Sequence, residues 1–479
     1  MDIKEFLNKI CNEIKYKPIR KEISEEIQTH IEEIKQNNIN NGMEEQIAEE
    51  KAIKEMGEAE EIGKQLNKIH RPKLDWKLLI LIIILTTYGL IIAILKEKST
   101  NNNYIANTIF HIIIGLIIGI AIYFFDYRKI KKYSNLIYII ATIIMILPKI
   151  GILSCYINGI PYIKIFNITI MSSSIAIPLY IIAFIGIILD YNNKVKIISK
   201  ENNKITINTE FIKIILITII SIILIIEINT LTNAIILAAI YTIIATVNIL
   251  QTSKNKWKKI AIMYAAIIIL PIILITLIYG ESPLSFTTSA FRINRILASF
   301  NPERDPQGAG YTGMLQKQII ENAKLIGEAD TEIISNGENI INSDTNYTFI
   351  YLLGKTGILA SSILLLTIIL TSIKLIKNAK NIKETYGKYI IIGLGSLYII
   401  QSIASVLMNI NLGIQSNINI PFVSYGGAYF IINVANIAII FSIYRRKDIN
   451  LKEEKNEGKL KKLSNMLIKL DQKLNNVND

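Results

Sequence analysis

The spacing of hydrophobic residues separates a short N-terminal part of the chain from a long apolar part. Between residues 23 and 34, isoleucines recur every three or four positions with acids between them, which predicts an amphipathic helix. Asn41-Gly42 ends this helix, and a second helix over 43–56 ends at Gly57. With a third short helix over 58–69, the pattern predicts that residues 1–75 form a small cytoplasmic bundle of about three helices.

The remaining chain alternates long apolar runs with polar loops. Each run has about 18 or more residues, enough to cross the ~30 Å hydrocarbon core of a bilayer as a helix. Ten such spans are predicted, at roughly 77–95, 105–125, 134–152, 170–190, 211–228, 232–250, 259–279, 349–375, 388–410 and 422–444. The predicted fold class is therefore all-α: a polytopic membrane protein with ten transmembrane helices, the N-terminal bundle, and a large extracytoplasmic loop, about 280–348, between spans 7 and 8.

Lysine and arginine gather in the loops after the even-numbered spans, at 128–132, 194–204, 254–259 and 374–383. The loops after odd-numbered spans are poor in these residues or, after the seventh, long. The positive-inside rule therefore predicts that both termini are cytoplasmic. The same rule accounts for the formal net charge of +13, and 51% hydrophobic residues with a mean hydropathy of +0.39 exclude a nucleic-acid-binding protein.

Three parts are thus predicted: a helical prefix domain over 1–75, a membrane domain over 76–445 and a charged cytoplasmic tail helix over 446–479. Leucines at 460, 463, 467, 470 and 474 in the tail predict an amphipathic helix on the inner leaflet or a short coiled coil. Two cysteines and three scattered histidines predict neither a disulfide framework nor a metal site. The N-terminal residues lack the apolar stretch of a cleavable signal peptide.

The long outer loop opens with candidate anion-binding and turn residues. Arg292 and Arg295 are three residues apart, so on a helix they share a face. Their guanidinium groups can hold a diphosphate, or they can extend to lipid headgroups. The segment that follows is rich in residues that favour turns and tight backbone geometry: Asn301, Pro302, Asp305, Pro306, Gly308, Gly310 and Tyr311.

Other polar groups stand at the predicted outer boundary of the membrane. Asp344 and Asn346 precede span 8, where they are site residues or where Asp344, Thr345 or Asn346 caps the helix N-terminus. Gln401 lies in span 9. The small residues that open span 10 permit close packing of helices, and a proline suits a first helical turn. The residues of this opening segment are Pro421, Ser424, Tyr425, Gly426 and Gly427.

Together these segments resemble the shape, elongation, division and sporulation (SEDS) family of bacterial cell-wall proteins, which includes FtsW, RodA and SpoVE. The family pattern R-x-x-R, followed by N/D-P-x-x-D-P-x-G-x-G-Y, is matched between Arg292 and Tyr311. The family's L-P-F-I-S-Y-G-G is matched by residues 420–427. Residues 158–174 are similar to an eroded N-G-A-x-R-W-I…Q-P-S-E segment, and residues 1–75 resemble the helical prefix domain of bacterial permease-like proteins.

This resemblance implies a peptidoglycan glycosyltransferase of the bacterial cytoplasmic membrane that acts in cell-wall synthesis for division, shape or sporulation. Its substrate would be lipid II, an undecaprenyl-diphosphate-linked disaccharide, polymerised at the outer face. Its partner would be a class B penicillin-binding protein transpeptidase. Arg292 and Arg295 would bind the diphosphate, and an Asp in a T-D-F-I-F motif at the start of span 8 would be catalytic. No cofactor is implied with certainty, and a divalent cation is left open.

The chain departs from the family at that catalytic position. Counting back from Gly357 places Asn346 where the family has its Asp. A neutral amide cannot accept a proton as a carboxylate does, so Asp344, two residues earlier, is the alternative base. Further family positions are also changed: the family's E-E is Gly354-Lys355, its Q-P-S-E acid is Ser174, and its Trp is Tyr162.

These changes leave three functions open. The first is the polymerase, with Asp344 or Asn346 at the acceptor sugar. The second is a non-catalytic scaffold or sensor that binds lipid II or a wall synthase. The third is a lipid II flippase, which needs polar groups inside the membrane to pass a headgroup. The predicted span interiors are nearly free of charge, which disfavours transport.

Overall fold

The computed structural model describes residues 2–70, 72–100, 102–157, 160–165, 168–198, 204–227, 231–252, 261–262, 264–265, 294, 296–330 and 343–447. The chain divides into two compact units, Met1–Leu74 with Arg445–Asp479, and Asp75–Tyr444. Most of the predicted seventh span, Arg292, Arg295 and the predicted tail helix lie outside the described residues.

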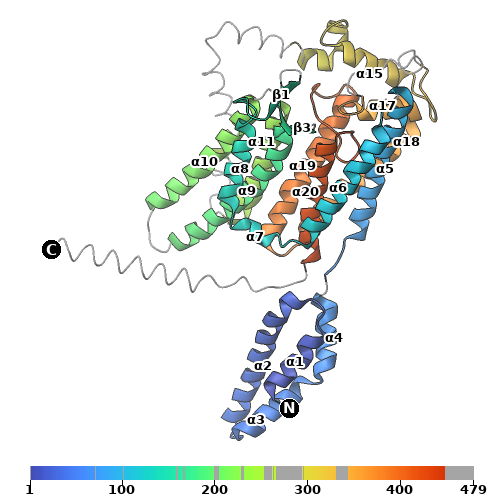
Figure 1. Ribbon diagram of the computed structural model, residues 1–479. Coiled ribbons are helices and arrows are strands. Elements are labelled where there is room, and N and C mark those ends of the chain that lie inside the picture. The colour runs from blue at the N-terminus through green and yellow to red at the C-terminus, as the bar shows by residue number, and fades with distance from the viewer. Residues whose placement is uncertain are drawn as a thin grey trace, which may run out of the picture. The chain divides into compact units, whose positions relative to one another are not determined.

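The described residues of the first unit, Met1–Leu74 with Arg445–Asp479, form four helices, where the sequence predicts about three for residues 1–75. They are α1 (Ile3–Glu13), α2 (Arg20–Asn40), α3 (Glu45–Met56) and α4 (Ala59–His70), with a 3-10 turn over Lys17–Ile19 (Figure 1). The unpredicted helix is α1. Asp2 caps it by accepting a hydrogen bond from the backbone N–H of Glu5 at 2.6 Å, and Phe6 and Ile10 are fully buried on one face.

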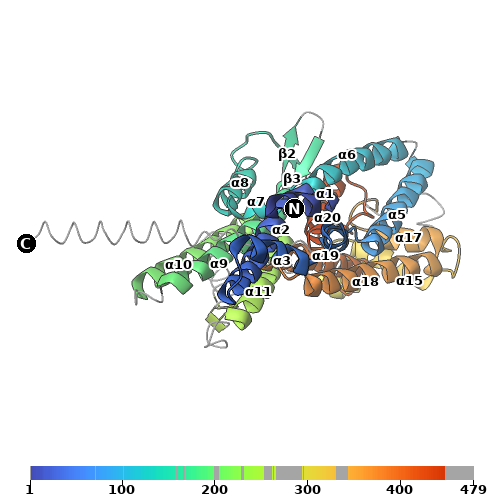
Figure 2. The same ribbon diagram turned by 90° about the horizontal axis from the view of Figure 1, so that it is seen from below.

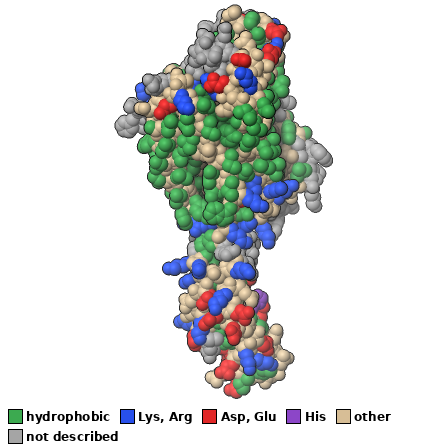
Figure 3. Space-filling model, turned by 90° about the vertical axis from the view of Figure 1, so that its right-hand side faces the viewer, with side chains coloured by type: hydrophobic (Ala, Val, Ile, Leu, Met, Phe, Trp, Pro, Cys, Tyr) green, Lys and Arg blue, Asp and Glu red, His purple; other side chains and the backbone are tan. Residues whose placement is uncertain are grey.

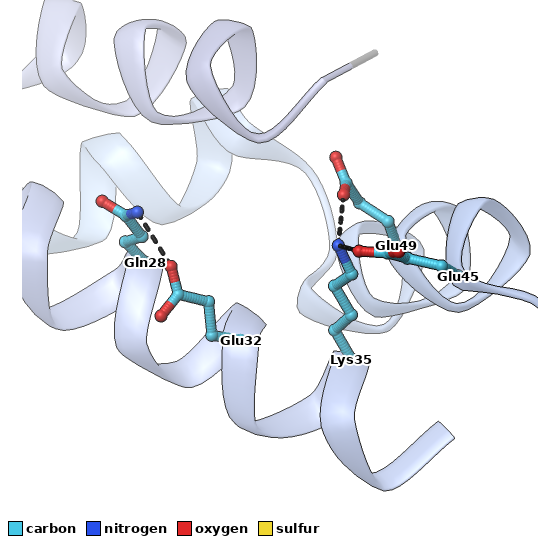
Figure 4. Close-up of polar contacts among 5 residues, drawn as sticks. All are labelled: Gln28, Glu32, Lys35, Glu45 and Glu49. Atoms are coloured by element: carbon cyan, nitrogen blue, oxygen red, sulfur yellow. Dashed lines mark hydrogen bonds and ion pairs between the residues drawn. The ribbon is translucent and has the colours of Figure 1, made fainter. Parts of the chain in front are cut away.

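The turns that follow α2 and α3 lie where glycine predicts them. Gly42 and Gly57 have φ angles of +88° and +93°, in the region that glycine adopts without strain. Across the first turn, Lys35 of α2 lies between Glu45 and Glu49 of α3, with its Nζ 2.9 Å from an oxygen of each (Figure 4). Hydrogen bonds to Glu49 and Glu45 raise the pKa of Lys35 and fasten α3 to α2.

The second unit is a bundle of helices that includes α5 (Trp76–Thr100), α6 (Tyr104–Phe124), α7 (Arg128–Lys131), α8 (Ser134–Ile146), α9 (Ser172–Ile198), α10 (Lys204–Glu227), α11 (Leu231–Thr252), α15 (Tyr311–Glu321), α17 (Thr348–Thr356), α18 (Ile358–Asn381), α19 (Thr385–Asn409) and α20 (Gly427–Arg445). A 3-10 turn, η3 (Pro302–Arg304), precedes α15. Figure 2 shows α19 and α20 between one group of helices, α8–α11, and another, α5, α6, α17 and α18.

Seven helices in the described part of the chain are long and apolar enough to cross a membrane: α5, α6, α9, α11, α18, α19 and α20. The apolar helix α8 has 13 residues, and α10, with 24, lies at the predicted fifth span. Figure 3 shows hydrophobic side chains in a continuous band over one face of this unit, with charged side chains mainly along its edges. The chain is a multi-pass membrane protein, and the count of ten spans stays a prediction.

A three-stranded antiparallel sheet between α8 and α9 corrects the predicted all-α fold. Its strands are β1 (Ser154–Ile157), β2 (Ile160–Ile165) and β3 (Ile168–Met171), paired in that order. Tyr162 of the central strand lies opposite Cys155 and Met171. Six isoleucines within 154–171, two pairs of them at alternate positions, favour strands because a β-branched side chain packs well on a pleated surface. The sheet and α15 lie at the same end of the bundle (Figure 1).

Candidate functional site

A cavity of about 300 Å³ lies at the end of the membrane unit that carries the sheet. Its walls come from the sheet, from α9, α11, α19 and α20, and from the segments before α17 and α20. Five predicted site residues line it: Asn346, Gln401, Tyr425, Gly426 and Gly427. Tyr162 and Ser174, at two of the changed positions, line it as well.

The segment that carries Asn346 is fixed by α19. Asn409, fully buried in the last turn of α19, donates from Nδ2 to the backbone oxygen of Asn346 at 3.0 Å. Its Oδ1 accepts from the backbone N–H of Ile350, also at 3.0 Å, and so satisfies one of the free N–H groups in the first turn of α17. The N-cap of α17 is Tyr347, without a side-chain capping bond, so the predicted capping role of Asp344 or Asn346 is not what holds this helix end.

The side chain of Asn346 is held at the cavity wall. It is 8% exposed, and its Nδ2 donates to Oδ1 of Asn417 at 2.9 Å. This bond assigns the amide nitrogen to Asn417 and leaves Oδ1 as the atom of the side chain that can accept a further hydrogen bond. The site therefore offers a fixed hydrogen-bond acceptor that cannot take up a proton.

Asp344 lies outside the residues that line the cavity. Its backbone oxygen accepts from the N–H of Tyr425 at 2.8 Å, and its Oδ2 accepts from the hydroxyl of Tyr104 at 3.5 Å. The ring of Tyr104 packs on that of Tyr425, with centroids 4.8 Å apart. The carboxylate thus faces α6, which does not favour Asp344 as the replacement base.

The motif from Pro421 to Gly427 forms a loop, although the sequence predicts the opening of span 10 there; α20 begins only at Gly427. Phe422 adopts a φ of +69°, which is unfavourable for a bulky residue and marks a tightly determined turn. Ser424 Oγ lies 3.0 Å from the hydroxyl of Thr348 in the first turn of α17. The loop is therefore tied to the segment that carries Asn346.

Gly427 and Gln401, two of the five predicted residues that line the cavity, have close neighbours. His111 of α6 packs so closely on Gly427 that a Cβ on Gly427 would overlap the imidazole, as expected for close packing at a small residue. Gln401, 8% exposed on α19, accepts from the hydroxyl of Tyr429 through Oε1 at 3.4 Å.

The turn-rich motif of the long loop is a compact structure around Asp305. The Asp305 backbone oxygen accepts from the N–H groups of Gly308 and Gly310 at 3.2 and 2.9 Å, and its Oδ2 accepts from the N–H of Ala309 at 2.8 Å. A Cβ on Gly310 would overlap the backbone oxygen of Pro302, which explains the need for glycine there. These contacts indicate that the motif shapes the loop between η3 and α15.

Arg292 and Arg295, which the sequence predicts to bind diphosphate, fall outside the described residues.

Lys317 of α15 forms an ion pair of 2.6 Å with Glu303 in the neighbouring motif. The hydrogen bond from Lys317 holds the pKa of Glu303 below its ordinary value.

The described residues that line the cavity include no Asp, Glu, Lys, Arg or His. They include seven amide side chains: Asn233, Asn346, Gln401, Asn417, Asn419, Asn433 and Asn436. Of these, only Asn346 and Gln401 are among the residues predicted from the sequence. Single asparagines inside or beside apolar spans are the signal that could have identified the others. Within the described part of the chain, no cluster of three His, Cys, Asp or Glu residues could hold a metal ion.

A family model described as "Cell cycle protein" and named for FtsW, RodA and SpoVE matches residues 73–449. Over 396 residues the chain is 24% identical to the probable peptidoglycan glycosyltransferase FtsW of Nitrosomonas europaea, a match that covers 79% of this chain and 94% of the relative. It is 25% identical over 174 residues to the protein of that name from Enterococcus hirae, of which it spans 44%. It is 23% identical over 164 residues to stage V sporulation protein E of Bacillus subtilis, covering 33% of this chain and 43% of the relative.

Two solved structures share the fold. One, from a study of the structural coordination of polymerization and crosslinking by a peptidoglycan synthase complex, has a TM-score of 0.59 at 15% identity and covers 79% of this chain and 99% of the other. The other is the rod shape determining protein RodA of Thermus thermophilus, with a TM-score of 0.51 at 14% identity, covering 78% of this chain and 97% of the other.

Proposed function

We propose that this chain, which belongs to the FtsW, RodA and SpoVE family of cell cycle proteins, is a SEDS-type protein of peptidoglycan synthesis that binds lipid II at the outer face of the cytoplasmic membrane. The observation that carries this proposal is the cavity around Asn346. The loop 421–427 contributes three of its residues to the wall and is tied by Ser424 to the segment that carries Asn346. Relatives named for glycosyl transfer and for sporulation support a role in wall synthesis.

Polymerisation of lipid II into glycan strands is the first candidate activity. In that reaction a sugar hydroxyl attacks an anomeric carbon whose leaving group is undecaprenyl diphosphate. The attack needs a base for the hydroxyl proton and cations that steady the departing diphosphate. Arg292 and Arg295 are the proposed cations. Asn346 would orient the acceptor hydroxyl through Oδ1, and the base would have to come from outside the described cavity wall.

A non-catalytic scaffold or sensor is the second candidate, and the lack of charged side chains among the described residues of the cavity wall favours it. Asn346 stands in place of the family's catalytic Asp, and the wall includes Ser174 in place of a second family acid. Such a protein would bind lipid II, or a class B penicillin-binding protein loaded with it, and communicate with the cytoplasmic side through the prefix domain.

Transport of lipid II is the least supported function. The cavity extends to Asn436, nine residues into the 19-residue helix α20, or about 14 Å from its start. The cavity therefore reaches about half-way along α20, whereas a headgroup path needs polar groups along the whole length of the bundle.

In the proposed orientation, the cavity lies at the extracytoplasmic side of the membrane. The basic residues of α7 and of the last turns of α18 stand at the opposite end from the sheet, and basic residues favour the cytoplasmic side. This orientation gives the cavity access to precursor on the outer leaflet and to the extracytoplasmic domain of a penicillin-binding protein.

The deciding experiment measures lipid II binding and lipid II polymerisation separately, with the full-length purified protein in lipid nanodiscs. Glycan strands formed from labelled lipid II, alone or with a class B penicillin-binding protein, identify the polymerase. Binding without strands identifies the non-catalytic protein. If lipid II binds no better than an undecaprenyl monophosphate control, the proposed function is wrong.

A further inference from the structure

We infer that the turn after α8, residues 147–153, and strand β1 contact the lipid bilayer at the boundary between headgroups and acyl chains. The contact surface is a patch of four exposed side chains: Ile150, Ile152, Leu153 and Tyr156. It lies on the side of the sheet that faces away from the cavity, and its partner is the lipid itself. The inference does not depend on the binding of lipid II.

The patch is apolar and close in sequence. Its four side chains are between 49% and 60% exposed, and the chain from Ile150 to Ile163 contains no charged residue. The hydroxyl of Tyr156 donates to the backbone oxygen of Pro148 at 3.4 Å, which ties the strand to the turn. Single exposed apolar residues are ordinary, whereas a group of them marks an interaction surface.

The pairing of the strands separates the patch from the cavity. Ile157 of β1 lines the cavity, as does Tyr162 of β2, which lies opposite Cys155. Side chains alternate between the two faces of a sheet, so Tyr156, between Cys155 and Ile157, points to the other face. The turn bound to Tyr156 is on that second face as well, and the patch is therefore a surface distinct from the cavity.

The patch continues the lipid-facing side of α8. The exposed apolar residues of α8 recur every three or four positions, which places them on one side of the helix. They are Leu136, Ile139, Ile140, Ile143 and Ile146. Ile150 extends this stripe beyond the end of α8, because its N–H donates to the backbone oxygen of Ile146 at 3.1 Å, as in a further helical turn. Lipid covers an exposed apolar stripe on a membrane helix, and so it reaches the start of the patch.

The length of α8 places the turn within the membrane. The third span is predicted over 134–152, but α8 ends at Ile146, and its 13 residues cover only about 20 Å. The hydrocarbon core is ~30 Å thick, and the basic residues of α7 with Lys132 mark its boundary at the start of α8. About 10 Å of the core therefore remains beyond Ile146, and residues 147–157 follow there.

The backbone of the turn suits a surrounding that offers few hydrogen bonds. The N–H groups of the four residues from Lys149 to Ile152 all donate to backbone oxygens within 146–152, at 3.0–3.3 Å. Backbone in contact with lipid has to be satisfied internally in this way. The charge of Lys149 is paired with Glu227 of α10, at 2.5 Å between Nζ and Oε2.

The sheet sets the depth of the contact. Strand β1 is an edge of the sheet, so one row of its N–H and C=O groups lies outside the ladder. Such groups cannot remain in hydrocarbon, whereas headgroups and water can pair with them. Only the boundary accommodates both this edge and the apolar patch. Tyrosine is enriched at that depth, because its ring is apolar and its hydroxyl polar.

The test measures the depth of single tryptophans by fluorescence quenching with brominated lipids. The background is the full-length protein with Trp76→Phe and Trp257→Phe, which removes both native tryptophans. It is placed in nanodiscs whose lipids carry bromine either near the glycerol end or near the far end of the acyl chains. Leu153→Trp and Tyr156→Trp report on the patch.

Two further tryptophans calibrate the measurement. Ile143→Trp is on the exposed stripe of α8, about 14 Å from the start of the helix and so near the middle of the core. Ile47→Trp is at a position 57% exposed on α3 of the prefix domain, as exposed as the patch but surrounded by water.

We expect both patch tryptophans to lose fluorescence chiefly to bromine near the glycerol end. The loss should be comparable to that of Ile143→Trp with bromine near the chain ends, and Ile47→Trp should lose little to either lipid. If the patch tryptophans behave like Ile47→Trp, the inference is wrong and the patch is open to a protein partner. Stronger quenching by the deep bromine would also overturn it, because β1 would then lie inside the core. Tyr156→Trp keeps an aromatic ring at an exposed position, so the test stands even if Leu153→Trp prevents accumulation of the protein.

Discussion

Asn346 and Asn417, 71 residues apart in the chain, are joined side chain to side chain by a hydrogen bond of 2.9 Å. The bond crosses from the segment before α17 to the segment before α20, at the edge of the cavity. It occupies the amide nitrogen of Asn346, so the carbonyl oxygen of this side chain remains as its acceptor. An Asp at position 346 would place oxygen against Oδ1 of Asn417, so Asn417 would have to turn its amide to donate.

Asn409 should be a major support of this site. Asn409→Ala leaves the backbone oxygen of Asn346 and the N–H of Ile350 without their present partner. We expect a clearly lower midpoint of thermal unfolding, because each buried group left unpaired costs about 1–3 kcal/mol. The control is Asn322→Ala at an exposed position at the end of α15. Equal midpoints for the two variants would show that Asn409 does not hold the start of α17.

The proposed orientation can be tested with a thiol reagent that does not cross membranes. In a background with Cys11→Ser and Cys155→Ser, Ile326→Cys, at a position 69% exposed, should be labelled in intact cells. Glu60→Cys, exposed in the prefix domain, should be labelled only after permeabilisation. The opposite pattern would invert the topology and place the cavity at the cytoplasmic face.

Arg292 and Arg295 are predicted to hold the diphosphate. Changing either to Ala should weaken binding of undecaprenyl diphosphate by about 1.5–3 kcal/mol, the range for hydrogen bonds to charge. Lys should rescue only in part, because it lacks the bidentate geometry of arginine. Unchanged binding in the double Ala variant would mean that the two side chains contact lipid headgroups instead.

The motif that leads into α15 should loosen in acid. Its ion pair with Lys317 lowers the pKa of Glu303 below the ordinary 4.5. A carboxyl group whose pKa is lowered in the folded state stabilises the fold at pH values above its ordinary pKa. This contribution is lost as the pH falls through the lowered pKa. Hydrogen exchange or proteolysis of residues 302–317, with its intrinsic pH dependence subtracted, should therefore increase below about pH 4.5. Glu303→Gln should remove that component, and an unchanged pH profile in this variant would show that another group is responsible.

The sequence predicted the membrane helices and the motifs better than the site they build. Apolar runs identify spans because a chain in lipid has to form its backbone hydrogen bonds internally, as a helix does. Gly42 and Gly57 lie at the ends of helices as expected. The sheet over 154–171 was not predicted, because residues 158–174 were interpreted only through their resemblance to a family segment and not through their isoleucine spacing. The amide wall was missed because Asn233 and Asn433 stand alone in sequence; only the packing of α9, α11 and α20 brings them to one cavity.

The last prediction concerns position 346, where family membership and side-chain chemistry disagree. Because the described residues of the cavity wall include no charged side chain, we expect that the native protein binds lipid II with polymerisation near background. Asn346→Asp should then raise polymerisation strongly, because a general base is worth about 10²–10⁴-fold and Asn417 can turn its amide to donate to the new carboxylate. The measurement is strand formation from labelled lipid II by protein in nanodiscs, with Asn346→Ala as the control for simple removal of the amide.

Asp344 provides the opposing outcome. Its carboxylate faces Tyr104 of α6, so Asp344→Asn should leave lipid II binding in place and should not affect the activity gained by Asn346→Asp by more than a few fold. If the native protein already polymerises and Asp344→Asn abolishes that activity, Asp344 is the base and the segment before α17 must rearrange during turnover. If the native protein is active and insensitive to both changes, the base lies elsewhere, and the assignment of Asn346 to the family's catalytic position is wrong.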